Sequence, residues 1–134
     1  MSLCLIMTVC QSVVAVEIVA NPDVPMKQLT RNELQAIFTM RLRAWSNGVP
    51  IRVFVLADSA PLHAEFAKEK LSIFPYVLRN YWDRMVFSGT GQFPTELGSP
   101  NEMRERIADT PGSIGYLPVE LIDPRVRALK VINP

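Results

Sequence analysis

Apolar and polar positions follow two different rhythms along this chain, and together they predict strands separated by helices. The β-branched run at residues 16–20 and the mostly apolar run at residues 51–56 are typical of buried strands. Extended segments are also predicted at residues 114–117 and 126–132. Strands joined through helices require crossover connections, so the pattern predicts an α/β fold with a mixed, largely parallel sheet flanked by helices.

Several predicted helices begin at recognisable capping signals. Thr30 stands three residues before Glu33, which predicts a capping box at a helix start. Ser99 and Glu102 predict a second capping box in the same way. Residues 75–87 repeat apolar pairs at helical spacing, so this stretch is predicted to be a helix with one wide face against the core.

The stretch that follows residues 51–56 has the order strand, short polar loop and helix start. Asp58 or Ser59 is expected to cap this helix, and Pro61 fits its first turn. Helix starts present free amide groups and a partial positive charge, which favour anions. Ser59 would add a hydroxyl donor, and Asp58 could accept a proton from a protonated oxyanion. Simple helix capping by the same residues is the alternative interpretation.

Composition indicates an ordinary globular chain without a strong electrostatic field. Hydrophobic residues make up 49% of the 134 positions and charged residues 20%, which argues against disorder. The formal net charge of +1 gives no basis for recruiting nucleic acid or an anionic membrane surface. The length suits a single domain at residues 16–134. Any partner must therefore be recognised through a local site.

Residues 1–15 are uncharged and largely apolar. A bilayer span needs about 20 residues, so this segment is predicted to be a secretory signal peptide, with no membrane insertion of the mature chain. The first basic residue is Lys27, which is unusual for a signal, and a buried N-terminal strand is the competing interpretation. Cys4 and Cys10 both fall in this segment, so the mature domain would hold no disulfide and no cysteine-based metal site.

Motifs for catalysis, metal binding or a cofactor are missing from the sequence. His63 is the single histidine and has no second nitrogen ligand, so no metal site is predicted. No Gly-x-Ser-x-Gly elbow is present, and Gly89-Thr90-Gly91 is better interpreted as a helix stop than as a phosphate loop. The chain is therefore predicted not to be an enzyme and to use no cofactor. His63 is interpreted as a solvated helix residue, and Trp45, Trp82 and Tyr81 as core residues.

Three segments in this order resemble one protein family. Residues 33–38, residues 45–51 and the Thr-Pro-Gly-Ser-Ile-Gly-Tyr stretch at 110–116 are similar to phosphate-type substrate-binding proteins of bacterial ABC transporters. The resemblance covers most of the chain after residue 15, and the stretch at 110–116 is its most specific part. It implies a type 2 periplasmic-binding-protein-like fold, export to the periplasm and binding of an oxyanion.

The chain departs from that family in its loop and in its size. Full-length members carry Arg-x-Asp-x-Ser-Gly-Thr after the strand, whereas residues 56–61 read Leu-Ala-Asp-Ser-Ala-Pro, without the arginine and the Gly-Thr pair. Pro61 also removes an amide donor. Residues 16–134 are too few for two lobes of about 100 to 150 residues each, so a deep enclosed site would need a partner chain or a reduced cleft.

The resulting hypothesis is a periplasmic substrate-binding-like domain that binds phosphate or another small oxyanion, or presents itself to a membrane transporter or sensor protein. Asp58 and Ser59 are the first candidates for ligand contact, followed by Asn21 and Ser113. The alternative is a protein-interaction or sensor-accessory module with a degenerate solute site, which the altered loop at residues 56–61 favours.

Overall fold

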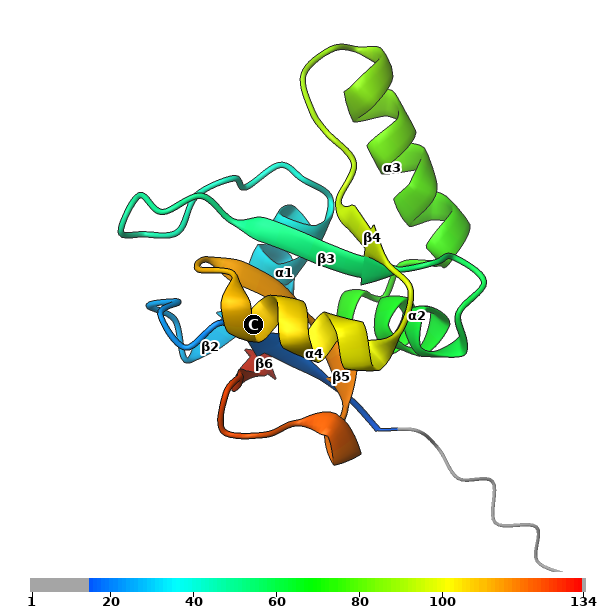
Figure 1. The fold of residues 1–134 in the computed structure, drawn as a ribbon. Coiled ribbons are helices and arrows are strands. Elements are labelled where there is room, and N and C mark those ends of the chain that lie inside the picture. The colour runs from blue at the N-terminus through cyan, green and yellow to red at the C-terminus, as the bar shows by residue number, and fades with distance from the viewer. Residues whose placement is uncertain (1–14, 134) are drawn as a thin grey trace, which may run out of the picture.

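The structure, a computed structural model, describes residues 15–133, which contain one six-stranded mixed sheet (Figure 1). The strands are β1 (Val16–Ala20), β2 (Gln28–Thr30), β3 (Arg52–Leu56), β4 (Thr95–Leu97), β5 (Ser113–Pro118) and β6 (Arg127–Ile132). Their spatial order is β2-β6-β1-β5-β3-β4. Strand β1 is antiparallel to β5 and β6, and the other neighbouring pairs are parallel. This arrangement confirms the predicted fold class. The edge strands β2 and β4 are too short to show an alternating pattern in the sequence.

Residues 1–14 and residue 134 lie outside the described part of the chain. Both cysteines and nearly all of the predicted signal peptide fall there, so the signal peptide stays a prediction. Within residues 15–133, no helix is long and apolar enough to cross a membrane.

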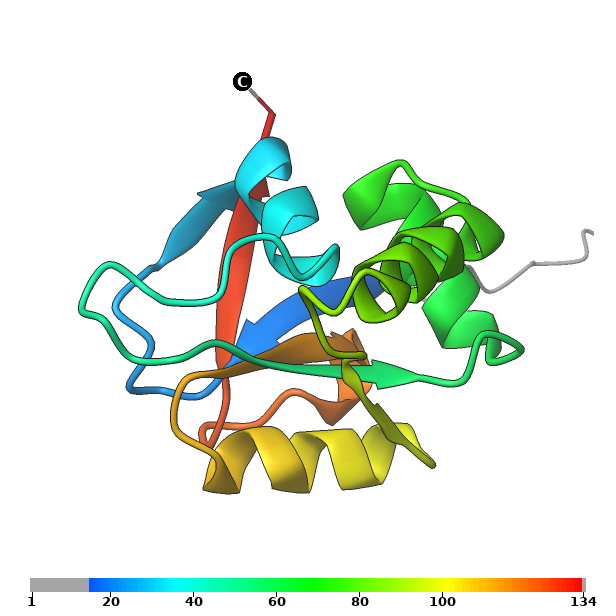
Figure 2. The same cartoon turned by 90° about the horizontal axis from the view of Figure 1, so that it is seen from above.

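Helices cover both faces of the sheet (Figure 2). They are α1 (Arg31–Phe38), α2 (Pro61–Phe66), α3 (Pro75–Phe87) and α4 (Pro100–Asp109), with a π-helical turn η1 (Ala67–Leu71) continuing α2 and a 3-10 turn η2 (Val119–Leu121) after β5. Figure 2 shows α4 against one face, with α1 and α2 on the opposite face. Each layer contributes large buried side chains, among them Phe38, Phe66 and Met103.

The face of α3 that contacts the core is narrower than its sequence pattern predicts. Leu78 and Trp82 are buried, and Trp45 of the preceding connection is buried as well. Tyr81, however, is 43% exposed, so its assignment to the core is wrong. The reason is positional, because α3 extends past the edge strand β4, where no further strand covers it (Figure 1).

The capping signals are confirmed at α1 and partly confirmed at α4. The Thr30 hydroxyl accepts from the N–H of Glu33 at 3.1 Å, and the Glu33 carboxylate accepts from the N–H of Thr30 at 3.0 Å. At α4 the Ser99 hydroxyl accepts from the N–H of Glu102 at 3.1 Å. The Glu102 carboxylate, in contrast, accepts from the N–H of Gly98, one residue before the expected partner.

Helix α2 begins without a side-chain cap, so the predicted cap at Asp58 or Ser59 is wrong. Ala60 occupies the N-cap position and Pro61 the first turn. The Asp58 carboxylate bonds instead to Arg79. A proline at this position has no N–H to satisfy, which reduces the need for a cap.

Gly112 joins the segment at residues 110–116 to the rest of the fold. Its carbonyl accepts from Trp45 Nε1 at 3.0 Å and from the N–H of Arg52 at 3.1 Å. Its φ of +75° lies in the left-handed region, and a Cβ here would collide with the carbonyl oxygen of Pro50. Position 112 therefore requires glycine for two reasons. The backbone there is left-handed, and a side chain would collide with Pro50.

Two glycine variants separate these two requirements. Gly48 also has a left-handed φ, of +82°, but nothing lies within 4 Å of a Cβ placed there. Gly48→Ala should lower the free energy of unfolding by about 1 kcal/mol, the usual cost of the left-handed conformation. Gly112→Ala should lower it by roughly 3 kcal/mol or more, because backbone atoms must also move. Urea unfolding followed by circular dichroism measures both, and equal losses would contradict the role given to Gly112.

Candidate functional site

The loop at residues 57–60 leaves the carboxyl end of β3 and leads into α2. Strand β3 runs parallel to both of its neighbours, β4 and β5, so the carboxyl ends of three strands point toward this side of the sheet. Open α/β sheets bind their ligands outside the carboxyl ends of parallel strands. The topology therefore places Asp58 and Ser59 where a ligand site is expected.

Asp58 holds an arginine from α3 against this loop. The carboxylate of Asp58 accepts two hydrogen bonds from Arg79, from Nε at 2.9 Å and from Nη2 at 2.9 Å. These bonds lower the pKa of the Asp58 carboxyl group. The guanidinium carbon also lies 5.0 Å from the ring centroid of Trp82 and 5.7 Å from that of Phe93. Such bidentate and stacked contacts fix the orientation of the guanidinium.

Arg79 is the residue of this site that the sequence analysis missed. The apolar pattern of residues 75–87 assigns it to the polar face of the helix, and no local signal indicates that it reaches Asp58. It nevertheless brings a guanidinium to a loop whose own position 56 is leucine.

The side chains of Arg79, Asp58 and Ser59 keep hydrogen-bonding groups exposed to solvent. The side chains of Arg79 and Asp58 are 35% and 38% exposed, and Ser59 is exposed. Among residues 15–133, Arg79 bonds through Nε and Nη2 only, and the Ser59 hydroxyl contacts no hydrogen-bond partner. Arg79 Nη1 and the Ser59 hydroxyl can therefore donate to a bound oxyanion.

His63 lies directly beneath the loop and is fully buried, so its interpretation as a solvated residue is wrong. The Tyr116 hydroxyl accepts from the N–H of Leu56 at 2.7 Å and lies 2.6 Å from His63 Nδ1. When Tyr116 donates its proton to Nδ1, all three groups are satisfied and the imidazole proton sits on Nε2. Nε2 faces Asp58 Oδ1 at 3.9 Å and has no hydrogen-bond partner within the described residues.

Burial keeps this His63–Tyr116 pair uncharged. It lowers the pKa of the His63 imidazole, an effect only partly opposed by the nearby Asp58 carboxylate. It also raises the pKa of the Tyr116 phenol. A neutral polar pair thus supports the charged Asp58–Arg79 pair from below. No group of three carboxylate, imidazole or thiol side chains able to hold a metal ion occurs in residues 15–133.

Asn21 and Ser113, the other two predicted contacts, lie elsewhere. The Asn21 amide donates to the carbonyl oxygens of Ile107 at 2.9 Å and Ala108 at 3.1 Å, and the Ser113 hydroxyl donates to that of Ile107 at 3.1 Å. Both side chains are buried and tie the carboxyl end of α4 to the sheet.

The four predicted residues therefore do not form one site. Ser113 pairs with Arg52 at the beginning of β3, whereas Asp58 and Ser59 follow its end. At about 3.3 Å per residue, the two groups are separated by roughly 15 to 20 Å. A ligand role for Asn21 and Ser113 stays a prediction, and the geometry gives them a structural role.

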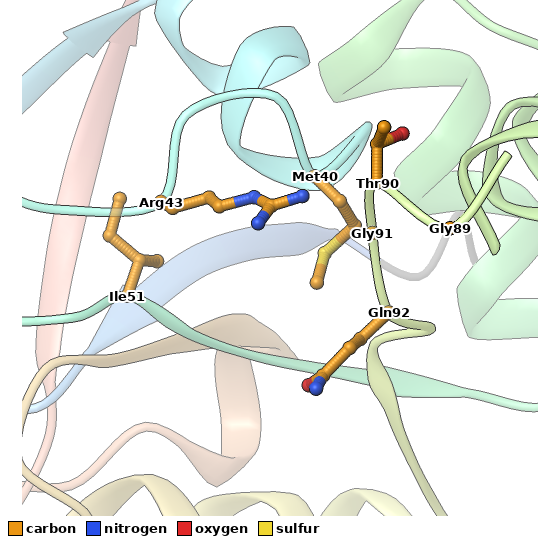
Figure 3. Close-up of a pocket in the computed structure, with 7 residues that line it drawn as sticks. All are labelled: Met40, Arg43, Ile51, Gly89, Thr90, Gly91 and Gln92. Atoms are coloured by element: carbon orange, nitrogen blue, oxygen red, sulfur yellow. The ribbon is translucent and has the colours of Figure 1, made fainter.

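A separate cleft opens beside the beginning of β3 (Figure 3). It has a volume of about 310 Å³. Its walls are formed by Met40, Arg43, Ile51 and the segment Gly89, Thr90, Gly91 and Gln92. The side chain of Arg43 extends across the cleft from the connection between α1 and β3.

Solved structures with this fold include phosphate-transport proteins. An ABC-type phosphate transport receptor from Vibrio cholerae superposes with a TM-score of 0.68 at 16% identity, covering 87% of this chain and 45% of that one. A putative phosphate ABC transporter substrate-binding protein with bound phosphate, from Clostridium perfringens, also gives 0.68, at 17% identity, covering 87% of this chain and 44% of that one. At these identities the likeness shows the fold.

The relationship of this chain to a protein family comes from sequence comparison. The phosphate-binding protein PstS of Bacillus subtilis is 30% identical over 128 residues, which cover 90% of this chain. The chain is related to the phosphate-type substrate-binding proteins of ABC transporters. It spans 37% of the length of PstS and less than half of each superposed structure. No protein-family model matches the chain.

The buried His63 predicts a specific dependence of stability on pH. Its folded pKa is lowered from the ordinary value of 6.5, so below pH 6.5 the unfolded chain binds a proton that the folded chain does not. The free energy of unfolding should fall with decreasing pH from 6.5 toward the lowered folded pKa, by up to about 1.4 kcal/mol per pH unit. Asp58 contributes in the same direction, but only below its ordinary value of 3.8.

Urea titrations at several pH values between 7.5 and 5 measure this dependence. His63→Phe removes the titrating group, which is the single histidine of the chain, and should flatten the curve in this interval. An unchanged slope in the variant would show that His63 does not cause it.

Proposed function

We propose that this chain is a non-enzymatic solute-binding domain that binds phosphate at the loop of residues 57–60. The observation that carries the proposal is the Arg79–Asp58 pair beside Ser59 at the carboxyl end of β3. Support comes from the relatives, since PstS is named as a phosphate-binding protein and the Clostridium protein holds bound phosphate. By the same relationship, we propose export to the periplasm and cooperation with a membrane transporter or sensor.

The chemistry of the loop suits an oxyanion that retains a proton. Arg79 Nη1 and the Ser59 hydroxyl would donate to two phosphate oxygens. Asp58 accepts from Arg79 on both oxygens but keeps lone pairs that can accept the P–OH proton of phosphate. Sulfate carries no proton near neutral pH, so Asp58 would repel it. The loop should therefore prefer phosphate to sulfate.

The contacts are few and partly exposed to water, which limits the affinity. Pro61 provides no amide at the start of α2, and Arg79 and Asp58 are about one-third exposed. A hydrogen bond or ion pair in such surroundings contributes about 1 kcal/mol. A second surface that covered this loop would strengthen these contacts, because it would exclude water from them.

Removing the arginine tests the site directly. In isothermal titration calorimetry, Arg79→Gln should weaken phosphate binding at least about tenfold, and Ser59→Ala about fivefold, because each removes a donor. Arg84→Gln is the matched control, since it makes the same charge change on an exposed position of α3 and should leave binding unchanged. Circular dichroism checks that each variant is folded. Equal phosphate affinity in wild type and Arg79→Gln would refute the site.

The role of the Asp58 carboxylate is tested by the selectivity of the site for phosphate over sulfate. Asp58→Asn removes the negative charge and supplies an amide donor, so sulfate should bind more tightly than it does to wild type and the ratio of phosphate to sulfate affinity should fall toward one. Competition measurements by calorimetry give this ratio. An unchanged ratio would remove Asp58 from the site. Folded wild-type protein that binds neither anion would favour the alternative of an interaction module.

A further inference from the structure

The cleft of Figure 3 differs from the phosphate loop in position and in charge balance. It shares no lining residue with residues 57–60. Arg43 is its single charged lining residue, and none of the others is acidic. Within residues 15–133, Arg43 has no carboxylate within 4.0 Å and its guanidinium makes no hydrogen bond, whereas Arg79 and Arg125 are both paired.

The segment that carries Arg43 is held in place by its own hydrogen bonds. The N–H of Ile51 donates to the Arg43 carbonyl at 2.8 Å, and the N–H of Trp45 donates to the Val49 carbonyl at 2.9 Å. The buried indole of Trp45 anchors this turn to Gly112. One wall of the cleft is therefore preformed.

The opposite wall is also fixed. The N–H groups of Thr90 and Gly91 both donate to the carbonyl of Met85, each at 3.1 Å. A Cβ on Gly91 would lie 2.9 Å from the Met85 Cβ and 3.5 Å from Arg43 Nη2. Because Gly91 has no side chain, the backbone at this residue can pass close to both α3 and Arg43.

Met40, another residue that lines the cleft, has an unusual backbone conformation. Its φ is +67°, in the left-handed region that normally favours glycine at the end of a helix. This conformation closes the end of α1, where the N–H of Arg41 donates to the carbonyl of Ala36 at 2.9 Å. The thioether side chain of Met40 projects into the cleft beside Arg43 (Figure 3).

We infer that this cleft binds a small organic carboxylate that carries a short apolar group. The planar guanidinium of Arg43 matches a carboxylate in a two-hydrogen-bond geometry. Met40 and Ile51 offer apolar surface, and Thr90 and Gln92 offer neutral hydrogen-bonding groups. A volume of about 310 Å³ lies at the small end of ligand pockets. The cleft also has no carboxylate among its lining residues to accept the proton of a phosphate, so the two sites differ in ligand class.

The test uses isobutyrate, isovalerate and benzoate as probes, with isobutyramide as the neutral control. Calorimetry and ¹H–¹⁵N NMR titration of the full chain should show carboxylate binding, with shifts at residues 89–92, and no response to the amide. Arg43→Gln should weaken binding at least about tenfold, and Arg43→Lys should retain part of it, because lysine keeps the charge and loses the planar geometry.

Crossed variants keep this inference separate from the phosphate site. Arg79→Gln and Arg84→Gln should leave carboxylate binding unchanged, and Arg43→Gln should leave phosphate binding unchanged. Equal carboxylate affinity in wild type and Arg43→Gln would overturn the inference. So would loss of carboxylate binding in Arg79→Gln, or the absence of binding to wild type by every probe at about 10 mM.

Discussion

The hydroxyl group of Tyr116 is the contact on which the geometry of the loop depends. It accepts from the N–H of Leu56, the last residue of β3, and faces Nδ1 of His63 in α2. One buried oxygen thus connects the end of β3, the middle of β5 and the first turns of α2, the three elements that surround residues 57–60. Because an unpaired buried polar group is costly, these groups favour one arrangement and resist others. The position of Asp58 follows from that arrangement.

Charge is distributed differently at the two concave surfaces. At the loop, Arg79 is hydrogen-bonded to Asp58 and lies 4.0 Å from the Glu96 carboxylate, so its guanidinium is not a free cation. At the cleft, Arg43 has no internal partner among the described residues, and its charge is available to a ligand. In the two proposals, the Asp58 carboxylate would select an oxyanion that keeps a proton, whereas the unpaired Arg43 would recognise a negative charge.

The described residues superpose on less than half of each larger phosphate-transport structure. Within residues 15–133, helices on both faces of the six-stranded sheet bury its apolar surface (Figure 2). The loop at the carboxyl end of β3 then remains accessible, with the Asp58 and Arg79 side chains about one-third exposed. Water therefore screens the charges of this loop more than it screens buried charges.

Local features of this structure were predictable from the sequence, and the composition of the site was not. The capping box at Thr30, the helix Pro75–Phe87 and the strands at Val16 and Arg52 depend on residues a few positions apart, so their patterns are visible along the chain. Asp58 and Ser59 could be named as candidates because a strand, a loop and a helix start follow one another directly. Arg79 lies 21 positions from Asp58, and Tyr116 lies 53 from His63. Such pairs are formed only when crossover connections bring β5, α2 and α3 to the same end of the sheet. No pattern of neighbouring residues can therefore encode where these side chains point.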